Sequence, residues 1–296
     1  MTLPVRRATV RAPVWKPPMS QPTDPQRPQG DLLAQLQRDK FVDRLWQRDG
    51  TLFVADDADI ATARAARDGM GWLFGLEKLR EAVEGLAVLA RVVERLRYDR
   101  VVVVAPAPIA AWADAVGRHL RGRRGLPLVA LWGTGDGDLD AALDGVRSTK
   151  PLFVLTATAG FEAAALHAHA ALRKRFGNGD DWVAVAPAGG EVDRLARREA
   201  FREIYALPAD IGARFATLSM ATLVPAALAG VVLHDALHRA EDMLDQCRDA
   251  DPTLNPGSLL GAWLVAASAQ KRHAHLSLSK DCRGFSDWLT HVLAPT

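Results

Sequence analysis

The sequence contains only two cysteines, Cys247 and Cys282, among 296 residues. This excludes a fold held together by disulfides and is typical of a reducing cytoplasm. The sequence also lacks an excess of either charge, because 37 Lys and Arg side chains stand against 35 Asp and Glu side chains. The total charge therefore gives no reason to expect nucleic acid or a membrane surface as a partner. No apolar run of signal-peptide length follows the first basic residues, so we expect a cytoplasmic protein.

One uncharged stretch raises the question of a membrane span. Residues 216–233 have no formal charge, but Thr217, Ser219, Thr222 and Pro225 lie among them. Because the stretch lies in the middle of the chain between amphipathic segments, we expect a buried core helix and no membrane span.

The first thirty residues differ in composition from the rest. They include seven prolines, and five basic side chains against one acidic side chain. Such a stretch buries too little apolar surface to offset its ordering entropy. We expect residues 1–30 to form a disordered arm in solvent, with docking on an acidic partner as the alternative.

From residue 31 onward, short apolar runs alternate with helical patterns. Hydrophobic positions repeat every three to four residues over 32–46 and 76–96, which predicts amphipathic helices. The predicted strands are 101–104, 128–132, 152–156 and 182–186, separated by helical stretches such as 162–176. This alternation predicts an α/β fold with a doubly wound, mostly parallel sheet in three α/β/α layers, of the flavodoxin-like kind.

The pattern becomes mostly helical after residue 208. The predicted helices are 211–230, 233–248, 256–269 and 285–292, with one more short strand at 275–279. We expect one domain over residues 31–270, with a helical N-terminal region, and a separate short segment over 271–296.

In a parallel sheet, ligands bind beyond the carboxyl ends of the strands. The first predicted strand is followed by Ala-Pro-Ala-Pro-Ile, which excludes a dinucleotide fingerprint and a P-loop there. The third is followed by a turn that contains Thr156, Thr158 and Gly160, which predicts at most a weak anion site, with capping of the next helix as the alternative. The fourth is followed by Gly189-Gly190, another weak signal. We expect no cofactor.

Metal sites are not expected either. Asp136, Asp138 and Asp140 alternate as in a calcium loop, but the glycine and the final acidic residue of that loop are missing. His234 and His238 have the spacing of two zinc ligands, but no third ligand is evident. The pairs His167 with His169 and His273 with His275 are interpreted as incidental, and no nucleophile motif is present.

A more specific pattern lies at residues 208–219, which read Pro-Ala-Asp-Ile-Gly-Ala-Arg-Phe-Ala-Thr-Leu-Ser. It resembles the signature of phosphoglucose isomerases, in which a Gly-Gly-Arg-Phe/Tyr-Ser turn opens a long helix. Three further segments, around Arg44-Leu45-Trp46, Gly71-Trp72-Leu73 and Asn255-Pro256-Gly257, resemble the isomerase half of bacterial transaldolase–isomerase fusions. The resemblance covers about residues 31–293 and implies a sugar isomerase (SIS) fold, with 271–296 as the remnant of a second SIS-like domain.

The chain departs from the family at the sites that hold a sugar phosphate. The family has a Gly-x-Gly-Gly-Ser turn after the first strand and a Ser-Lys-Ser/Thr turn after the third, and both are absent here. The resemblance therefore implies only a weak phosphosugar site at Thr156, Thr158 and Gly160. Of the family's catalytic residues only Arg214 matches, as the arginine that steadies the enediolate; turn capping or pairing with Asp210 is the alternative. The family's catalytic glutamate would fall beyond Leu293.

These departures lead to a functional hypothesis. We expect a catalytically degenerate relative of glucose-6-phosphate isomerase that acts as a binding or assembly subunit, with an isomerase, a transaldolase or a second copy as its partner. Two alternatives are an aldose–ketose isomerase whose site a partner chain completes and a sugar-phosphate sensor. The predicted interface is one face of the last helix, formed by Phe285, Trp288, Leu289 and Val292.

Overall fold

The computed structural model describes residues 27–55, 58–76, 79–131, 148–176, 179–270 and 278–294. The chain forms two compact units. The first comprises Met1–Met70, His238–Ser277 and Leu293–Thr296, and the second comprises Gly71–Leu237 and Leu278–Val292. The predicted strands all lie in the second unit, apart from the one over 275–279, so this unit contains the candidate site.

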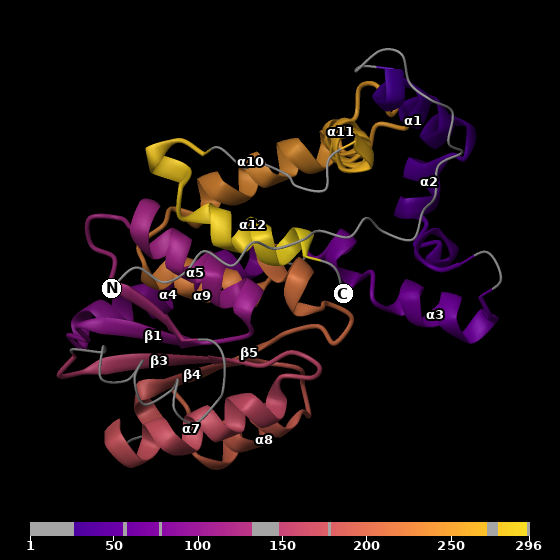
Figure 1. Cartoon of the computed structure of the whole chain (residues 1–296). Helices are drawn as coiled ribbons and strands as arrows, with labels where there is room; N and C mark the ends of the chain where they lie inside the picture. The colour runs from indigo at the N-terminus through magenta and orange to yellow at the C-terminus, as the bar shows by residue number, and fades with distance from the viewer. Residues whose placement is uncertain are drawn as a thin grey trace. The chain divides into compact units, whose positions relative to one another are not determined.

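The second unit is built on a five-stranded parallel sheet (Figure 1). Its strands are β1 (Arg100–Val104), β2 (Leu128–Leu131), β3 (Pro151–Thr156), β4 (Trp182–Ala186) and β5 (Glu203–Ala206). Their order is β2-β1-β3-β4-β5. The register pairs Val102 with both Val129 and Phe153, and Phe153 with Trp182. The predicted fold class, a doubly wound parallel α/β sheet, is confirmed.

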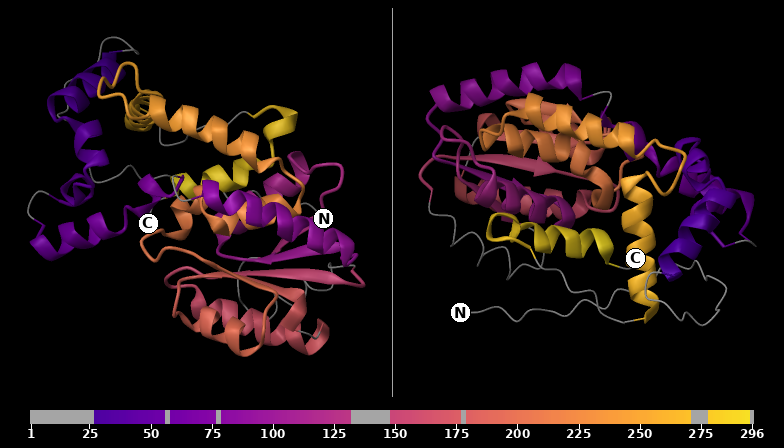
Figure 2. Two further views of the ribbon diagram at one scale, coloured as in Figure 1. Left: turned by 180° about the vertical axis from the view of Figure 1, so that it is seen from behind. Right: turned by 90° about the horizontal axis from the view of Figure 1, so that it is seen from above.

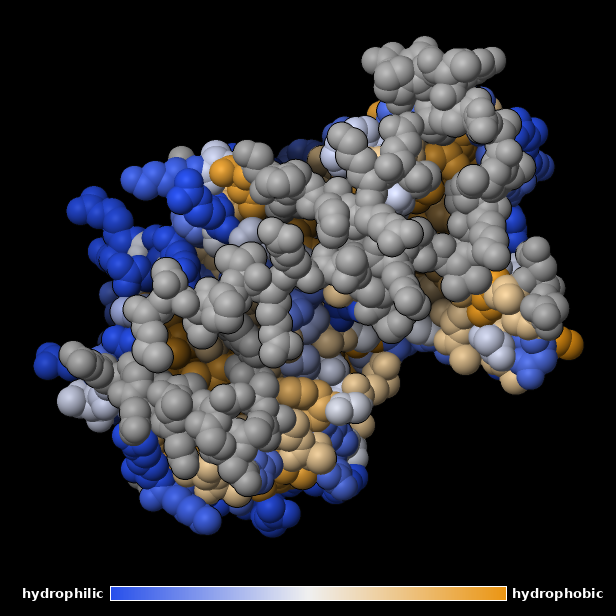
Figure 3. Space-filling model, viewed as in Figure 1, coloured by the Kyte–Doolittle hydropathy of each residue, from blue (hydrophilic) through white to orange (hydrophobic). Residues whose placement is uncertain are grey.

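Helices cover both faces of this sheet, as Figures 1 and 2 show. On one face lie α4 (Arg80–Arg95), α5 (Ala107–His119) and α9 (Met220–Leu228), and on the other lie α7 (Glu162–Phe176) and α8 (Glu191–Arg198). Hydrophilic residues gather over the outer surface of α7 and α8, at the bottom of the view in Figure 3. Because both faces are covered, β1, β3 and β4 are apolar along almost their whole length.

The core between the sheet and the α7/α8 layer contains large aromatic side chains. Phe153 and Trp182 are each 1% exposed, and their rings stack with centroids 4.4 Å apart. Burying one side chain of this size stabilises the fold by about 1.5–3 kcal/mol. The short apolar runs of the sequence therefore specify the strands through burial.

The strand β5 is not among the strands predicted from the sequence. It reads Glu-Ile-Tyr-Ala, lies at the sheet edge beside β4, and is buried only in part. Glu203 and Ala206 at its two ends are exposed. Unlike β2 at the opposite edge, β5 therefore lacks the continuous apolar run that predicted the other four strands.

Two predicted helices are interrupted. The helix predicted over 32–46 is two helices, α1 (Arg27–Arg38) and α2 (Phe41–Trp46), separated at Lys40, whose φ of 48° is left-handed. The helix α1 begins before the predicted end of the arm, so Arg27–Gly30 are helical, whereas residues 1–26 lie outside the described part. The helix predicted over 211–230 is the 3-10 helix η5 (Ala213–Leu218) followed by α9.

Ser219 accounts for the second break. Its hydroxyl donates to the carbonyl of Ala216 at 2.6 Å and accepts from the N–H of Ala221 at 3.2 Å, so it caps a new helix. All nine residues of α9 are buried, which agrees with the core helix expected there. Within the described part of the chain, no helix combines the length and apolar character that crossing a membrane requires.

The first unit is helical in its described residues. It contains α1, α2, η1 (Gly50–Phe53), α3 (Ile60–Asp68) and α11 (Pro256–Gln270), and α10 (Leu233–Gln246) runs into it from the second unit. Leu32 of α1 packs against Ala262 and Ala266 of α11. Of the strand predicted over 275–279, Leu278 and Ser279 have no regular structure, and the rest lies outside the described residues.

Candidate functional site

The candidate site is the carboxyl edge of the sheet, where ligands bind in parallel α/β folds. In the described residues this edge consists of the turns that follow β1, β3, β4 and β5. Residues 132–147, which follow β2, lie outside the described part, and with them Asp136, Asp138 and Asp140.

The turn between β1 and α5 has few backbone donors. Pro106 is the residue before α5, and Pro108 lies in its first turn, so two positions lack an N–H. The N–H of Ile109 is already used, since it donates to the carbonyl of Pro106 at 3.0 Å. An anion at this helix start would therefore meet few free N–H groups.

The turn between β3 and α7 contains the three residues expected to hold a phosphosugar. Thr156 is fully buried and Thr158 is 3% exposed, whereas Gly160 is exposed with a φ of 83°. The N–H of Phe161 donates to the carbonyl of Thr158 at 2.9 Å, so Gly160 occupies the turn position that requires a positive φ. The Thr156 hydroxyl is buried without a hydrogen-bond partner in the described structure.

The turn between β4 and α8 is occupied by carboxylates of the chain itself. The N–H of Gly189 donates to Asp193 Oδ2 at 3.0 Å, and the N–H of Glu191 donates to Glu162 Oε1 at 3.1 Å. A Cβ added to Gly190 would lie 2.2 Å from that Glu162 oxygen, so the glycine makes room for the carboxylate. Two N–H groups at the start of α8 that could bind an anion therefore already bind carboxylates of the chain itself.

Asp193 is held in this position by Arg197. The guanidinium donates from Nε and Nη2 to both carboxylate oxygens, at 3.1 and 3.0 Å. Hydrogen bonds from Arg197 and from the N–H of Gly189 lower the pKa of Asp193. The sequence analysis missed this pair, although the spacing of four residues on a helix, acid before base, is a recognisable signal.

Arg214 lies in η5, just beyond the end of β5, and is partly buried. It follows Gly212, which precedes the first residue of η5.

The short 3-10 helix η2 (Gly71–Phe74) supports the Arg214 segment. The N–H of Gly71 donates to the carbonyl of Asp210 at 3.1 Å. The Trp72 ring stacks on Phe215 with centroids 5.1 Å apart and an interplanar angle of 23°. The similarity at Gly71-Trp72-Leu73 therefore has a structural explanation.

Two other segments of the resemblance also have structural roles. Arg44 donates to Asp49 at 2.8 Å and to the Thr51 hydroxyl at 2.9 Å. Asn255 caps α11, because its Oδ1 accepts from the N–H of Ser258 at 3.0 Å. Both segments therefore stabilise the helical unit.

The predicted interface helix is present as α12 (Phe285–Leu293). Its predicted contact residues, Phe285, Trp288, Leu289 and Val292, are all partly buried. The N–H of Gly284 donates to His119 Nε2 at 2.9 Å, at the C-terminal end of α5. This contact docks the start of α12 within its own unit.

The described residues contain no group of three His, Cys, Asp or Glu side chains placed to bind a metal. His234 and His238 are exposed on α10, and each lies beside a carboxylate, Asp235 at 3.7 Å and Asp242 at 3.3 Å. Cys247 is partly buried and Cys282 is exposed, while His273 and His275 lie outside the described residues.

No protein-family model matches the chain. Two glucose-6-phosphate isomerases are similar in sequence: one from Parasynechococcus marenigrum, 32% identical over 94 residues, and one from Carboxydothermus hydrogenoformans, 27% identical over 109 residues. These regions cover 31% and 36% of this chain but only 17% and 23% of those relatives. The similarity in sequence is thus limited to part of each protein.

Solved structures extend the similarity to most of the fold. A glucose-6-phosphate isomerase from Chlamydia trachomatis has a TM-score of 0.61 at 14% identity, with 89% of this chain and 55% of that chain covered. A hypothetical protein from Thermus thermophilus has a TM-score of 0.63 at 18% identity, with 90% of this chain and 60% of that chain covered. In sequence and in fold, this chain is distantly similar to the glucose-6-phosphate isomerases, as its Arg214 segment predicted.

Proposed function

We propose that this protein is a catalytically degenerate relative of glucose-6-phosphate isomerase that acts as a binding or assembly subunit. The observation that carries the proposal is that two carboxylates of the chain accept the hydrogen bonds of this turn. Glu162 accepts from the N–H of Glu191, and Asp193 accepts from the N–H of Gly189. A phosphate dianion at this edge would find both N–H groups already bonded, one to the Glu162 carboxylate and one to Asp193, which pairs with Arg197. Its lost hydration would then be poorly compensated.

The turns around this position support the same proposal. The β1–α5 turn has prolines where N–H donors would be needed, and the β3–α7 turn keeps both of its threonines buried. Of the family's catalytic residues, only Arg214 has a match in this chain. A lone arginine can stabilise developing charge, but proton transfer between carbon atoms requires a positioned base.

Catalytic loss is tested by assaying interconversion of glucose 6-phosphate and fructose 6-phosphate with the full chain. We expect no turnover above the buffer rate, with an active glucose-6-phosphate isomerase at equal concentration as the positive control. Arg214→Gln serves as the matched variant, because it removes the one residue that matches the family's catalytic residues and keeps a polar side chain there. Turnover that this variant abolishes would disprove the loss of catalysis.

Assembly is tested by size-exclusion chromatography with light scattering, on the chain alone and mixed with an isomerase or a transaldolase. We expect a homo-oligomer or a mixed complex that Trp288→Ser weakens, since α12 displays an apolar, partly buried face. Ser286→Ala, on the same helix, is the control. A monomer that binds neither enzyme would contradict the assembly role.

A second function is favoured by Arg214, the one residue that matches the family's catalytic residues. An aldose–ketose isomerase whose site is completed by a partner chain would use this arginine and receive its base from the partner. Mixing with a candidate partner should then raise turnover, and Arg214→Gln should remove the gain. No gain on mixing would leave the assembly role as the better account.

A further inference from the structure

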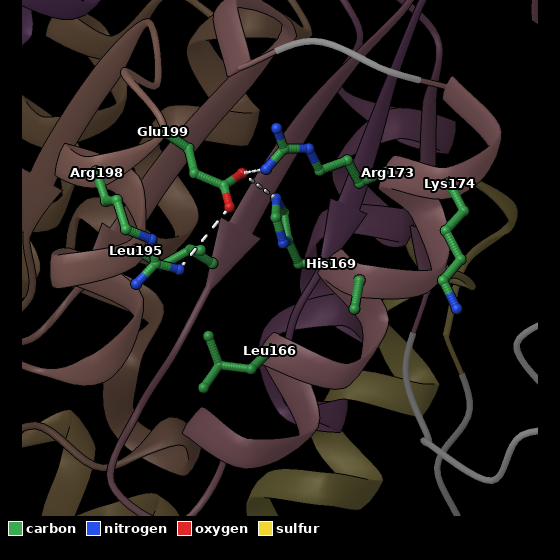
Figure 4. Close-up of a pocket in the computed structure, with 8 residues that line it drawn as sticks. Leu166, His169, Arg173, Lys174, Leu195, Arg198 and Glu199 are labelled. Atoms are coloured by element: carbon green, nitrogen blue, oxygen red, sulfur yellow. Dashed lines mark ion pairs between the residues drawn. The ribbon is translucent and has the colours of Figure 1, made fainter.

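A pocket with a volume of about 580 Å³ lies between α7 and α8, in the outer helical layer (Figure 4). It is formed by the C-terminal half of α7 and the last residues of α8. Helices in a parallel α/β fold run opposite to the strands, so the pocket lies toward the amino ends of the strands. It is thus separate from the carboxyl edge described above.

The base of the pocket contains a buried histidine whose Nε2 faces the Glu199 carboxylate. The side chain of His169 is 5% exposed and packs edge-on against the Trp182 ring, with centroids 4.5 Å apart. In the described structure, His169 Nε2 makes no hydrogen bond and lies 3.5 Å from Glu199 Oε2. Both atoms are buried, so His169 and Glu199 together form the closed base of the pocket.

Positively charged side chains lie around this end of the pocket. Glu199 pairs with Arg173 and lies 3.8 Å from Arg198, and Figure 4 shows its carboxylate between these side chains and His169. Lys174 also lines the pocket. Arg173, Lys174 and Arg198 thus line a pocket that contains one carboxylate, Glu199, which leaves an excess of two positive charges when His169 is neutral.

The remaining wall is apolar. Leu166 and Ala170 of α7 and Leu195 of α8 line the pocket beside the charged groups. A wall of this kind contacts the carbon skeleton of a ligand, while a few polar groups orient it. The pocket thus combines a cationic rim, a histidine–carboxylate pair and an aliphatic wall.

We propose that this pocket binds a phosphate monoester with a hydroxylated organic body, such as a nucleotide or a sugar phosphate. The phosphate dianion matches the excess of two positive charges from Arg173, Lys174 and Arg198. Hydroxyl groups of the body bond to the Glu199 carboxylate, and its carbon skeleton rests on Leu166 and Leu195. The site is independent of the carboxyl edge and of the proposed function.

The test is a calorimetric titration of the full chain with AMP, glucose 6-phosphate, adenosine and inorganic phosphate. We expect one equivalent of AMP or glucose 6-phosphate to bind about tenfold more tightly than inorganic phosphate, because phosphate alone lacks the body that contacts the wall. Adenosine, without the phosphate, should not bind measurably. The comparison of AMP with glucose 6-phosphate shows whether the pocket prefers a nucleotide or a sugar phosphate.

The variant Lys174→Gln/Arg198→Gln removes two exposed cations and should weaken this binding about tenfold or more. The matched control is Arg91→Gln/Arg95→Gln on α4, which makes the same charge change on the opposite side of the sheet. Equal thermal midpoints would exclude a folding effect. The proposal is overturned if both double variants bind AMP or glucose 6-phosphate with equal affinity. It is also overturned if inorganic phosphate binds and neither ester does, or if no ligand binds at millimolar concentration.

Discussion

Glu162 Oε1, in the first turn of α7, accepts a hydrogen bond from the N–H of Glu191, the first residue of α8, at 3.1 Å. A helix N-terminus attracts anions because its first N–H groups are free and its dipole is positive there. The side chain thus occupies a position that a ligand anion would otherwise take. The contact also joins the two helices that cover one face of the sheet.

The first prediction concerns this carboxylate. Glu162→Ala should raise the affinity of the carboxyl edge for inorganic phosphate about tenfold, because it removes a negative charge and frees the N–H of Glu191. The measurement is a phosphate titration followed by phosphorus NMR, with Glu84→Ala on α4 as the control of equal charge. An equal gain in both variants would attribute the effect to net charge alone.

The buried hydroxyl of Thr156 supplies a second prediction. Because it has no partner in the described structure, Thr156→Val should leave stability unchanged or raise it by up to about 1 kcal/mol. Urea unfolding measures the change, with Thr222→Val as the contrast, since that hydroxyl bonds to the carbonyl of Ser219 at 3.0 Å. Destabilisation by Thr156→Val would mean that the hydroxyl has a partner in solution.

His169 should make stability depend on pH. Burial lowers its pKa, and Arg173 and Arg198 lower the pKa further, against the opposing effect of Glu199. In the unfolded chain the imidazole has its ordinary pKa of about 6.5. Between the lowered folded value and about 6.5, the unfolded state binds more protons, so stability rises with pH in this window and is lost as pH falls.

Replacement of this histidine tests the dependence. His169→Gln should flatten the dependence of unfolding free energy on pH below about pH 6.5, and His234→Gln, at a side chain that is 83% exposed, is the control substitution. Urea titrations at several pH values give the slopes. An unaltered slope in His169→Gln would contradict the buried neutral imidazole.

The chain has two tyrosines, and both should ionise at a higher pH than a tyrosine in the unfolded chain. Burial first, and then the Asp181 carboxylate, raise the pKa of Tyr98 to about 12, and burial and Glu203 raise the pKa of Tyr205 to about 12. The unfolded chain ionises these groups near 10, so stability is complete below about pH 10 and declines as pH rises toward 12. Ultraviolet absorbance at about pH 11 should show little tyrosinate until denaturant is added.

Tyr98→Phe should also destabilise the protein at neutral pH. The Tyr98 hydroxyl donates to Asp181 Oδ1 at 2.7 Å and accepts from Arg202 Nη2 at 3.0 Å. Its removal should lower the free energy of unfolding by about 1–3 kcal/mol, because Asp181 and Arg202 each lose a hydrogen-bond partner. Tyr205→Phe is the comparison, and an equal effect of both substitutions would mean that this network contributes little.

The last prediction concerns α12. His119→Leu removes the acceptor for the N–H of Gly284, so α12 should detach more often and trypsin should cleave at Lys280 or Arg283 about fivefold faster. His119→Gln retains an acceptor and should restore most of the resistance. Gly284→Ala should resemble the leucine variant, because its Cβ would lie 2.5 Å from His119 Nε2. Equal cleavage in all three variants would contradict this docking.

Local sequence patterns determined most of the sheet. The runs at β1, β3 and β4 are apolar on both faces, as is typical of strands that helices cover on both sides. The resemblance around Arg214 likewise predicted the correct family of folds. In contrast, the edge strand β5 and the break at Lys40 depend on neighbours or on one backbone angle, which short-range periodicity does not encode.

The sequence by itself determined the parallel α/β architecture, the absence of the family's phosphate turns and the match of Arg214 to the family's arginine, because each follows from residue order along the chain. Only the tertiary structure decided that Glu162 reaches the start of α8, 29 residues away, and that His169, Arg173, Arg198 and Glu199 share one pocket. These relationships join residues of different helices. They exist only when packing against the sheet brings α7 and α8 side by side.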